Sequence, residues 1–126
     1  MATVTRIHYS RQRRMLELCF DDDSQALLSA EFLRVHSPSA EVKGHGPGQE
    51  TLQVGKLNVA IEAIKPVGHY AVQLVFDDGH DSGLFTWTYL HELATQQETL
   101  WARYLTAIDA AGASRDPNEQ VLHFQP

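Results

Sequence analysis

Seven histidines are the first candidates for chemistry in this 126-residue chain, because neutral imidazole is a common metal ligand. No His-x-x-x-His pair places two imidazoles on one helix face, and there is no Cys-x-x-Cys pair. No histidine has an acid two residues later, which is the usual sign of a two-histidine, one-carboxylate iron site. The spacing therefore indicates scattered surface or hydrogen-bonded histidines, at His8, His36, His45, His69, His80, His91 and His123.

Nucleophilic and phosphate-binding motifs give no stronger signal. There is no Gly-x-Ser-x-Gly elbow, and Cys19 has no neighbouring base in the sequence. The glycine-rich residues 44–48 lack the Gly-Lys-Ser or Gly-Lys-Thr ending of a phosphate loop. The acidic residues 21–23 and the arginines Arg11, Arg13 and Arg14 are typical of solvated turns. The sequence therefore predicts no catalytic, cofactor-binding or metal-ligating residue.

Length and charge narrow the function further. The chain fits one compact domain, and its 43% hydrophobic content is enough for a buried core. A net charge of -6 disfavours binding to nucleic acid or to anionic membranes. A single cysteine, Cys19, and the absence of a basic-then-apolar leader favour a reducing cytoplasm, and no apolar run is long enough to span a bilayer.

The sequence contains an internal repeat, which we call the echo, and this repeat sets the elements that must position any functional residue. Two stretches about 56 residues apart, 16–33 and 72–90, share one pattern. Each has an alternating strand ending in phenylalanine (Phe20 or Phe76), an acidic turn and a short returning strand. Ser29 and Thr86 then precede an aromatic–leucine pair, and their hydroxyls can cap a helix by accepting a backbone N–H. The pattern predicts a hairpin followed by a helix, twice.

The remaining segments predict connections and one further helix. Residues 41–55 hold four glycines and Pro47, which predicts a long surface loop. Thr95 and Glu98 form a Thr-x-x-Glu capping box that predicts a helix running to Gly112. We expect that helix to bury Leu100, Trp101, Tyr104, Leu105, Ile108 and Ala111. Polar residues dominate from residue 113, so residues 113–126 are expected to be a flexible tail.

A combination of segments resembles a known family. The segments concerned are residues 32–42, the loop 44–48, and residues 67–83 together with Trp87 and Tyr89-Leu90. Together they are similar to stand-alone bacterial relatives of the gamma-butyrobetaine hydroxylase N-terminal domain, a domain of unknown function. The resemblance runs from about residue 3 to residue 95, so it covers most of the chain.

The resemblance also bears on metal binding and activity. In the hydroxylases the domain is a zinc-binding cap with a Cys-Pro-Cys-x-x-Cys stretch and a distant histidine. The resemblance places Ser37, Ser39 and Val42 at the cysteine positions and His80 at the histidine. Two hydroxyls, a valine and one imidazole cannot form a tetrahedral soft-ligand zinc site, so the resemblance implies a fold that persists without the metal. The catalytic oxygenase barrel has no counterpart here, and related domains fused to ATPases similar to iron–sulfur carriers imply a docking or accessory role.

We therefore predict an α+β domain over residues 1–112, mainly antiparallel β-sheet built from two hairpin–helix echoes, plus a C-terminal helix. The predicted function is that of a cytoplasmic, non-enzymatic binding or accessory module with a protein partner and no cofactor, nucleic acid or membrane. The related zinc site would bring residues 36–39 close to His80, which gives the candidate interaction surface: Arg34, His36, Ser37, Ser39, His80, Asp81 and Trp87. The alternative is a metal-binding or iron–sulfur accessory protein that uses His36, His45 and His80.

Overall fold

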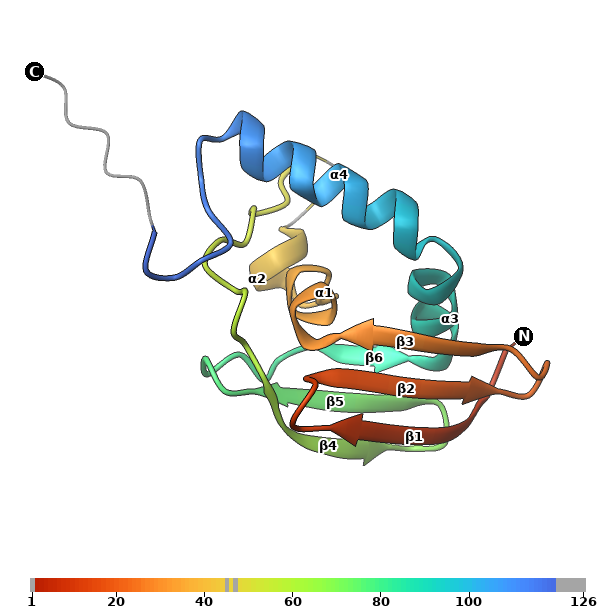
Figure 1. The fold of residues 1–126 in the computed structure, drawn as a ribbon. Coiled ribbons are helices and arrows are strands. Elements are labelled where there is room, and N and C mark those ends of the chain that lie inside the picture. Colours follow the sequence, from red (N-terminus) through yellow and green to blue (C-terminus); the bar gives the residue numbers. More distant parts are fainter. Residues whose placement is uncertain (1, 45, 47, 120–126) are drawn as a thin grey trace, which may run out of the picture.

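The computed structural model describes residues 2–44, 46 and 48–119. It has two three-stranded antiparallel sheets and four helices within that part of the chain (Figure 1). The first sheet is a meander followed by two short helices: β1 (Val4–Ser10), β2 (Met15–Phe20), β3 (Gln25–Ser29), α1 (Ala30–Val35) and α2 (Ala40–Lys43). The second repeats that order and ends in longer helices: β4 (Ile61–Val67), β5 (Ala71–Phe76), β6 (Leu84–Thr86), α3 (Trp87–Thr95) and α4 (Gln97–Ala110).

The predicted α+β class and the internal echo are confirmed. Each copy places its strands in chain order within its own sheet, and each returning strand leads directly into a helix. The Ser29 hydroxyl accepts a hydrogen bond from the Phe32 amide at 3.0 Å, and the Thr86 hydroxyl accepts one from the Tyr89 amide at 3.1 Å. The same local capping chemistry therefore starts a helix at the same point of each repeat.

The two acidic turns reverse the chain by different means. Gly79 has φ +88°, a conformation that glycine adopts without a steric penalty. In the first copy Asp23 takes φ +68° instead, and the Asp22 carboxylate accepts a hydrogen bond from the Ser24 amide at 2.9 Å. A side-chain hydrogen bond thus supports the turn that lacks glycine.

The inner faces of both sheets contribute to one core. The two-residue period of β2 and β5 points their buried side chains to the same side, where they meet α1 and α3. Figure 1 shows the sheets stacked and the helices gathered at one edge, with α4 lying across α1 and α2. The largest wholly buried side chains are Phe32, Phe76, Phe85, Leu16, Leu18, Leu28, Leu33, Leu74, Leu90 and Leu93.

The predicted capping box of the last helix is wrong. Helix α3 continues through Thr95, so that residue lies in a last helical turn and its hydroxyl donates back to the Glu92 carbonyl at 3.1 Å. Gln96 precedes α4 without a side-chain capping bond. Tyr104 and Ile108 are buried as predicted, but Leu105 and Ala111 are exposed because α4 packs on the domain through a narrow stripe.

Two further segments depart from the sequence-based picture in detail. Ser39 accepts a hydrogen bond from the Glu41 amide at 3.2 Å and starts the short helix α2, which extends into the stretch 41–55 expected to be loop. Near the C-terminus, the Ser114 and Arg115 carbonyls accept hydrogen bonds from the amides of Gly55 and Leu57 at 2.9 Å each. The flexibility of the end of the chain stays a prediction, and residues 120–126 lie outside the described residues. Within the described part, no helix has the length and apolar character needed to cross a membrane.

Candidate functional site

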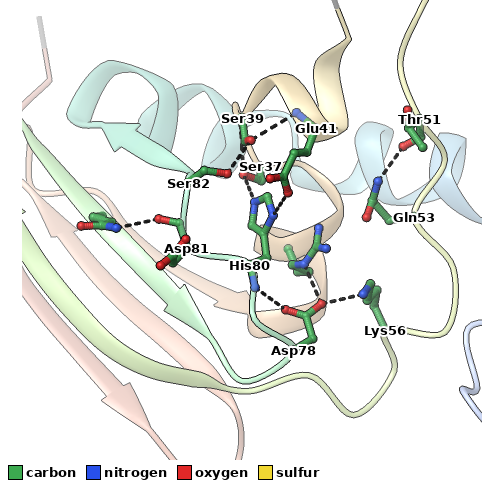
Figure 2. A network of polar contacts seen from close by, with 12 residues as sticks. Ser37, Ser39, Glu41, Thr51, Gln53, Lys56, Asp78, His80, Asp81 and Ser82 are labelled. Carbon is green, nitrogen blue, oxygen red and sulfur yellow. Dashed lines mark hydrogen bonds and ion pairs between the residues drawn. The ribbon is translucent and has the colours of Figure 1, made fainter.

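A cluster of polar side chains joins the corner between α1 and α2 to the turn between β5 and β6 (Figure 2). Ser37 Oγ lies 2.8 Å from His80 Nε2, and Ser39 Oγ lies 2.7 Å from Ser82 Oγ. Ser37, Ser39 and His80 are buried. We call Ser37, Ser39, Glu41, His80 and Ser82 the corner cluster; it ties together segments more than forty positions apart in the sequence.

Both ring nitrogens of His80 have partners. His80 Nδ1 lies 3.0 Å from Glu41 Oε2, and a carboxylate can only accept, so Nδ1 carries the hydrogen. In the neutral ring Nε2 then accepts from the Ser37 hydroxyl. The Asp78 carboxylate accepts from the His80 amide at 3.2 Å, which fixes the backbone on which the ring sits. Hydrogen bonds to both ring nitrogens and to the backbone amide therefore fix the position of His80.

Close packing at Gly83 keeps Ser37 in place. A Cβ atom at position 83 would overlap the Ser37 hydroxyl oxygen and lie 3.0 Å from the Phe85 ring. Only a residue without a side chain leaves room for the hydroxyl at this point. Gly83 therefore supports the corner cluster by leaving space for the Ser37 hydroxyl.

An ionic group lies beside the corner cluster. Arg34 Nε is 2.9 Å from Asp78 Oδ2, and Lys56 Nζ contacts the same oxygen at 2.5 Å. The Arg34 side chain is only 8% exposed, so the pair with Asp78 is largely shielded from water. Burial acts to raise the pKa of the Asp78 carboxyl, but bonds from Lys56, the His80 amide and Arg34 outweigh it and hold that pKa below its ordinary value.

The connectivity of the corner cluster matches that of a Ser–His–acid triad, with hydroxyl to Nε2 and carboxylate to Nδ1. A catalytic triad needs a serine hydroxyl that a substrate can reach and a buried acid, and neither condition is met here. Ser37 is 0% exposed, so no substrate carbonyl reaches its hydroxyl in this conformation. Glu41, in the place of the acid, is 71% exposed instead of buried. The arrangement is suited to holding a corner rather than to attacking a substrate.

The donor atoms also fail to suit the zinc ion of the hydroxylase caps. Ser37 and Ser39 offer hydroxyls that are already hydrogen-bonded, Val42 offers no donor, and both nitrogens of His80 are engaged. These are not the soft thiolate ligands that hold structural zinc. Among residues 2–44, 46 and 48–119, no three His, Cys, Asp or Glu side chains are grouped so that they could hold a metal. His45, a member of the alternative metal set, lies outside the described residues.

The structure brings together part of the predicted interaction surface. Ser37, Ser39 and His80 meet directly, and Arg34 joins them through Asp78. Four of the seven predicted residues are therefore buried beneath the surface: Arg34, Ser37, Ser39 and His80.

The other three predicted residues are not part of that buried group. Asp81 is next to His80 and exposed. The His36 ring packs against Phe32, with centroids 4.6 Å apart. Trp87 Nε1 donates to the His69 carbonyl at 2.8 Å, near the turn between β4 and β5.

Sequence reasoning missed four residues that complete the site: Glu41, Lys56, Asp78 and Ser82. Two local signals were available. Glu41 stands two positions after the Ser39 helix cap, and Asp78 precedes the positive-φ Gly79. Neither signal names the long-range partner, which only the packing of the two repeats supplies.

The chain matches the model of a known protein family. The family model described as gamma-butyrobetaine hydroxylase-like, N-terminal, matches residues 7–91. The chain belongs to this family. The match begins within β1 and ends within α3, so it contains the whole corner cluster but not α4. The family assignment agrees with the resemblance inferred from the sequence.

Solved structures agree with this placement. Two solution NMR structures are 52% and 49% identical, with TM-scores of 0.82 and 0.80; each covers 100% of this chain, and 99% and 95% of their own. A crystal structure of a protein of unknown function from Acidithiobacillus ferrooxidans, in the DUF971 family, is 37% identical with a TM-score of 0.62. That match covers 73% of this chain and 92% of the other. The comparison with curated proteins gives no match.

Proposed function

We propose that this domain is a non-enzymatic accessory module that docks onto a protein partner through the acidic surface above the corner cluster. The observation that carries the proposal is the position of Glu41. Its side chain is 71% exposed, yet its carboxylate is hydrogen-bonded to His80, whose side chain is 2% exposed. A surface charge is thereby held by a buried anchor.

This anchoring favours recognition. Fixing a side chain before binding reduces the entropy lost on association. Asp81 is exposed one position after His80, and Figure 2 shows it on the same turn. The Glu41 carboxylate, held by His80, and the exposed Asp81 complement a basic partner surface and help to orient it. In this proposal Arg34, Ser37, Ser39 and His80 act by holding the surface, not by touching the partner.

The absence of chemistry is part of the proposal. The buried Ser37 hydroxyl and the engaged His80 ring leave no accessible nucleophile–base pair in the corner cluster. The net charge of -6 supports a protein partner over nucleic acid or an anionic membrane. A single half-buried thiol, Cys19, is compatible with the reducing cytoplasm as the place of action.

Quantitative affinity capture from the source cells tests the proposal. The wild-type domain is compared with the double variant Glu41→Gln/Asp81→Asn and with the control Glu62→Gln/Glu92→Gln, which removes two exposed carboxylates elsewhere. We expect one set of proteins retained by wild type and control and lost by the first variant. Equal retention by all three would overturn the docking surface. Stoichiometric zinc or iron in the untagged protein would favour the metal-binding alternative.

A further inference from the structure

A groove separate from the corner cluster lies between α4 on one side and α1, α2 and residues 50–53 on the other. Its volume is about 540 Å³, which is in the range of small-molecule sites. Helix α4 contributes Leu100, Arg103, Tyr104 and Ala107 to the wall. The groove therefore depends on a helix that lies beyond residues 7–91, the part that the family model matches.

Two tyrosine rings form fixed walls of the groove. The Tyr89 hydroxyl donates to the His36 carbonyl at 2.6 Å, and the Tyr104 hydroxyl donates to the Gln53 carbonyl at 2.7 Å. Each hydroxyl is bound to the backbone, which holds its ring in place; Tyr104 is only 6% exposed, and Tyr89 is half-buried. Val35 and Leu100 extend this apolar lining.

Positive charge is concentrated at the same place. Lys43 and Arg103 line the groove against a single acidic residue, Glu50. Neither cation forms an ion pair within the described part of the chain. Lys43 Nζ lies 4.6 Å from the centroid of the Tyr89 ring, so its charge is placed over an aromatic wall. In a chain of net charge -6, this local excess of positive charge favours an anion.

His36 adds a polar atom to the lining. Its Nδ1 donates to the Phe32 carbonyl at 2.9 Å, and Nε2 has no hydrogen-bond partner in the residues that the structure describes. A neutral imidazole with Nδ1 protonated accepts a hydrogen at Nε2. The lining therefore offers two cations, an acceptor and two aromatic side chains.

We propose that this groove binds a small organic acid with an aromatic or branched apolar body. The carboxylate would pair with Lys43 and Arg103, since charge-assisted hydrogen bonds are the strongest contacts these side chains make. The apolar body would lie against Val35, Leu100 and the half-buried Tyr89. This site is independent of the docking surface proposed above, because none of the corner cluster residues lines the groove.

A titration followed by two-dimensional amide NMR tests the site, with 3-phenylpropionate as the probe and its primary amide as the uncharged control. We expect the acid to shift amide signals of residues 35–36, 42–43, 50–53, 89 and 103–104. Arg103→Met should weaken binding of the acid about tenfold and leave the amide unchanged. The matched control Lys65→Met removes an exposed cation on β4 and should have no effect.

Several results would overturn the proposal. Equal affinity for acid and amide would show that the cations do not recognise the ligand. Shifts confined to other parts of the domain, or no saturable shift up to about 10 mM acid, would remove the site. An acidic peptide that binds more tightly than 3-phenylpropionate at the same amides would assign the groove to a protein ligand, and concentration-dependent shifts without any probe would assign it to a second copy of the chain.

Discussion

Ser37 Oγ and His80 Nε2 lie 2.8 Å apart and connect segments 43 positions apart in the chain. By resemblance to the hydroxylase caps, this is where a cysteine and a histidine would share zinc. Here a hydroxyl, an imidazole and the Glu41 carboxylate link the two repeats through hydrogen bonds. The energetic weight of this link can be measured by removing one partner at a time.

Replacing Ser37 with alanine should destabilise the domain by about 1–3 kcal/mol, because His80 Nε2 would remain buried without a donor. Chemical denaturation measures the change in the free energy of unfolding. The exposed Ser24→Ala variant is the matched control and should change it by about 0.5 kcal/mol or less. Equal effects of the two variants would show that the buried hydrogen bond contributes little.

Adding a methyl group at Gly83 should cost about 1–3 kcal/mol, since the new Cβ would overlap the Ser37 hydroxyl oxygen. The Ser37→Ala change removes that oxygen, so the double variant should lose less stability than the sum of the two single variants. A double-mutant cycle with a coupling energy of about 0.5 kcal/mol or more would verify the contact. Strict additivity would contradict the packing described at this position.

Changing Asp78 to asparagine should destabilise the domain by about 3 kcal/mol, because Arg34 would remain buried without its carboxylate. The exposed pair Arg6 and Glu17 provides the control, and Glu17→Gln should have an effect of about 0.5 kcal/mol or less. Both variants are compared at neutral pH by thermal and chemical unfolding. A mild effect of Asp78→Asn would mean that Arg34 finds water or another acceptor.

Removing the end of the chain after residue 112 should destabilise the domain more than removal after residue 119. Glu31 is 6% exposed and accepts two hydrogen bonds from Arg115, at 2.8 Å and 2.6 Å, so the shorter chain leaves a buried carboxylate without a cation. Full-length Arg115→Ala separates this pair from the rest of the segment. Equal stability of the two truncated chains would place the domain boundary at residue 112, as predicted from the sequence.

Lowering the pH should decrease the free energy of unfolding of the domain because His36 becomes protonated. Burial, together with the nearby Lys43 charge, lowers the pKa of this histidine below its ordinary value of 6.5, despite the opposing effect of its bond to the Phe32 carbonyl. The unfolded chain then binds a proton more readily than the folded one, so stability is complete above pH 6.5 and falls as the pH decreases through the folded pKa. The difference in unfolding free energy between wild type and His36→Asn, followed from about pH 7.5 to pH 5, should shrink with acid. A constant difference would contradict a lowered pKa.

Local signals predicted the repeating elements well. Alternation gave the buried face of β2 and β5, and the hydroxyls of Ser29 and Thr86 gave both helix starts, because each depends on neighbours within a few positions. The Thr95 prediction failed for a related reason. A threonine can cap the next helix or end the previous one, and the length of α3 decides between the two.

The site was harder to predict because its partners are distant in sequence. The family resemblance placed Ser37, Ser39 and His80 together, and the structure confirms that juxtaposition. The Arg34–Asp78 pair spans 44 positions, and no residue spacing indicates it. Whether an arginine is solvated or buried depends on how the repeats dock, and docking has no local signature.

Among the residues that the structure describes, every strand pairing joins chain neighbours, β1 with β2 and β2 with β3, then β4 with β5 and β5 with β6. The pairings of each meander are local and can therefore form early without the other meander. The apolar face of each sheet stays exposed to solvent until the other sheet packs against it. We expect the association of the two halves to come late in folding, and a chain cut near residue 47 supplies both as separate fragments. Such fragments should reassemble when mixed, which makes the domain a candidate scaffold for split-reporter assays.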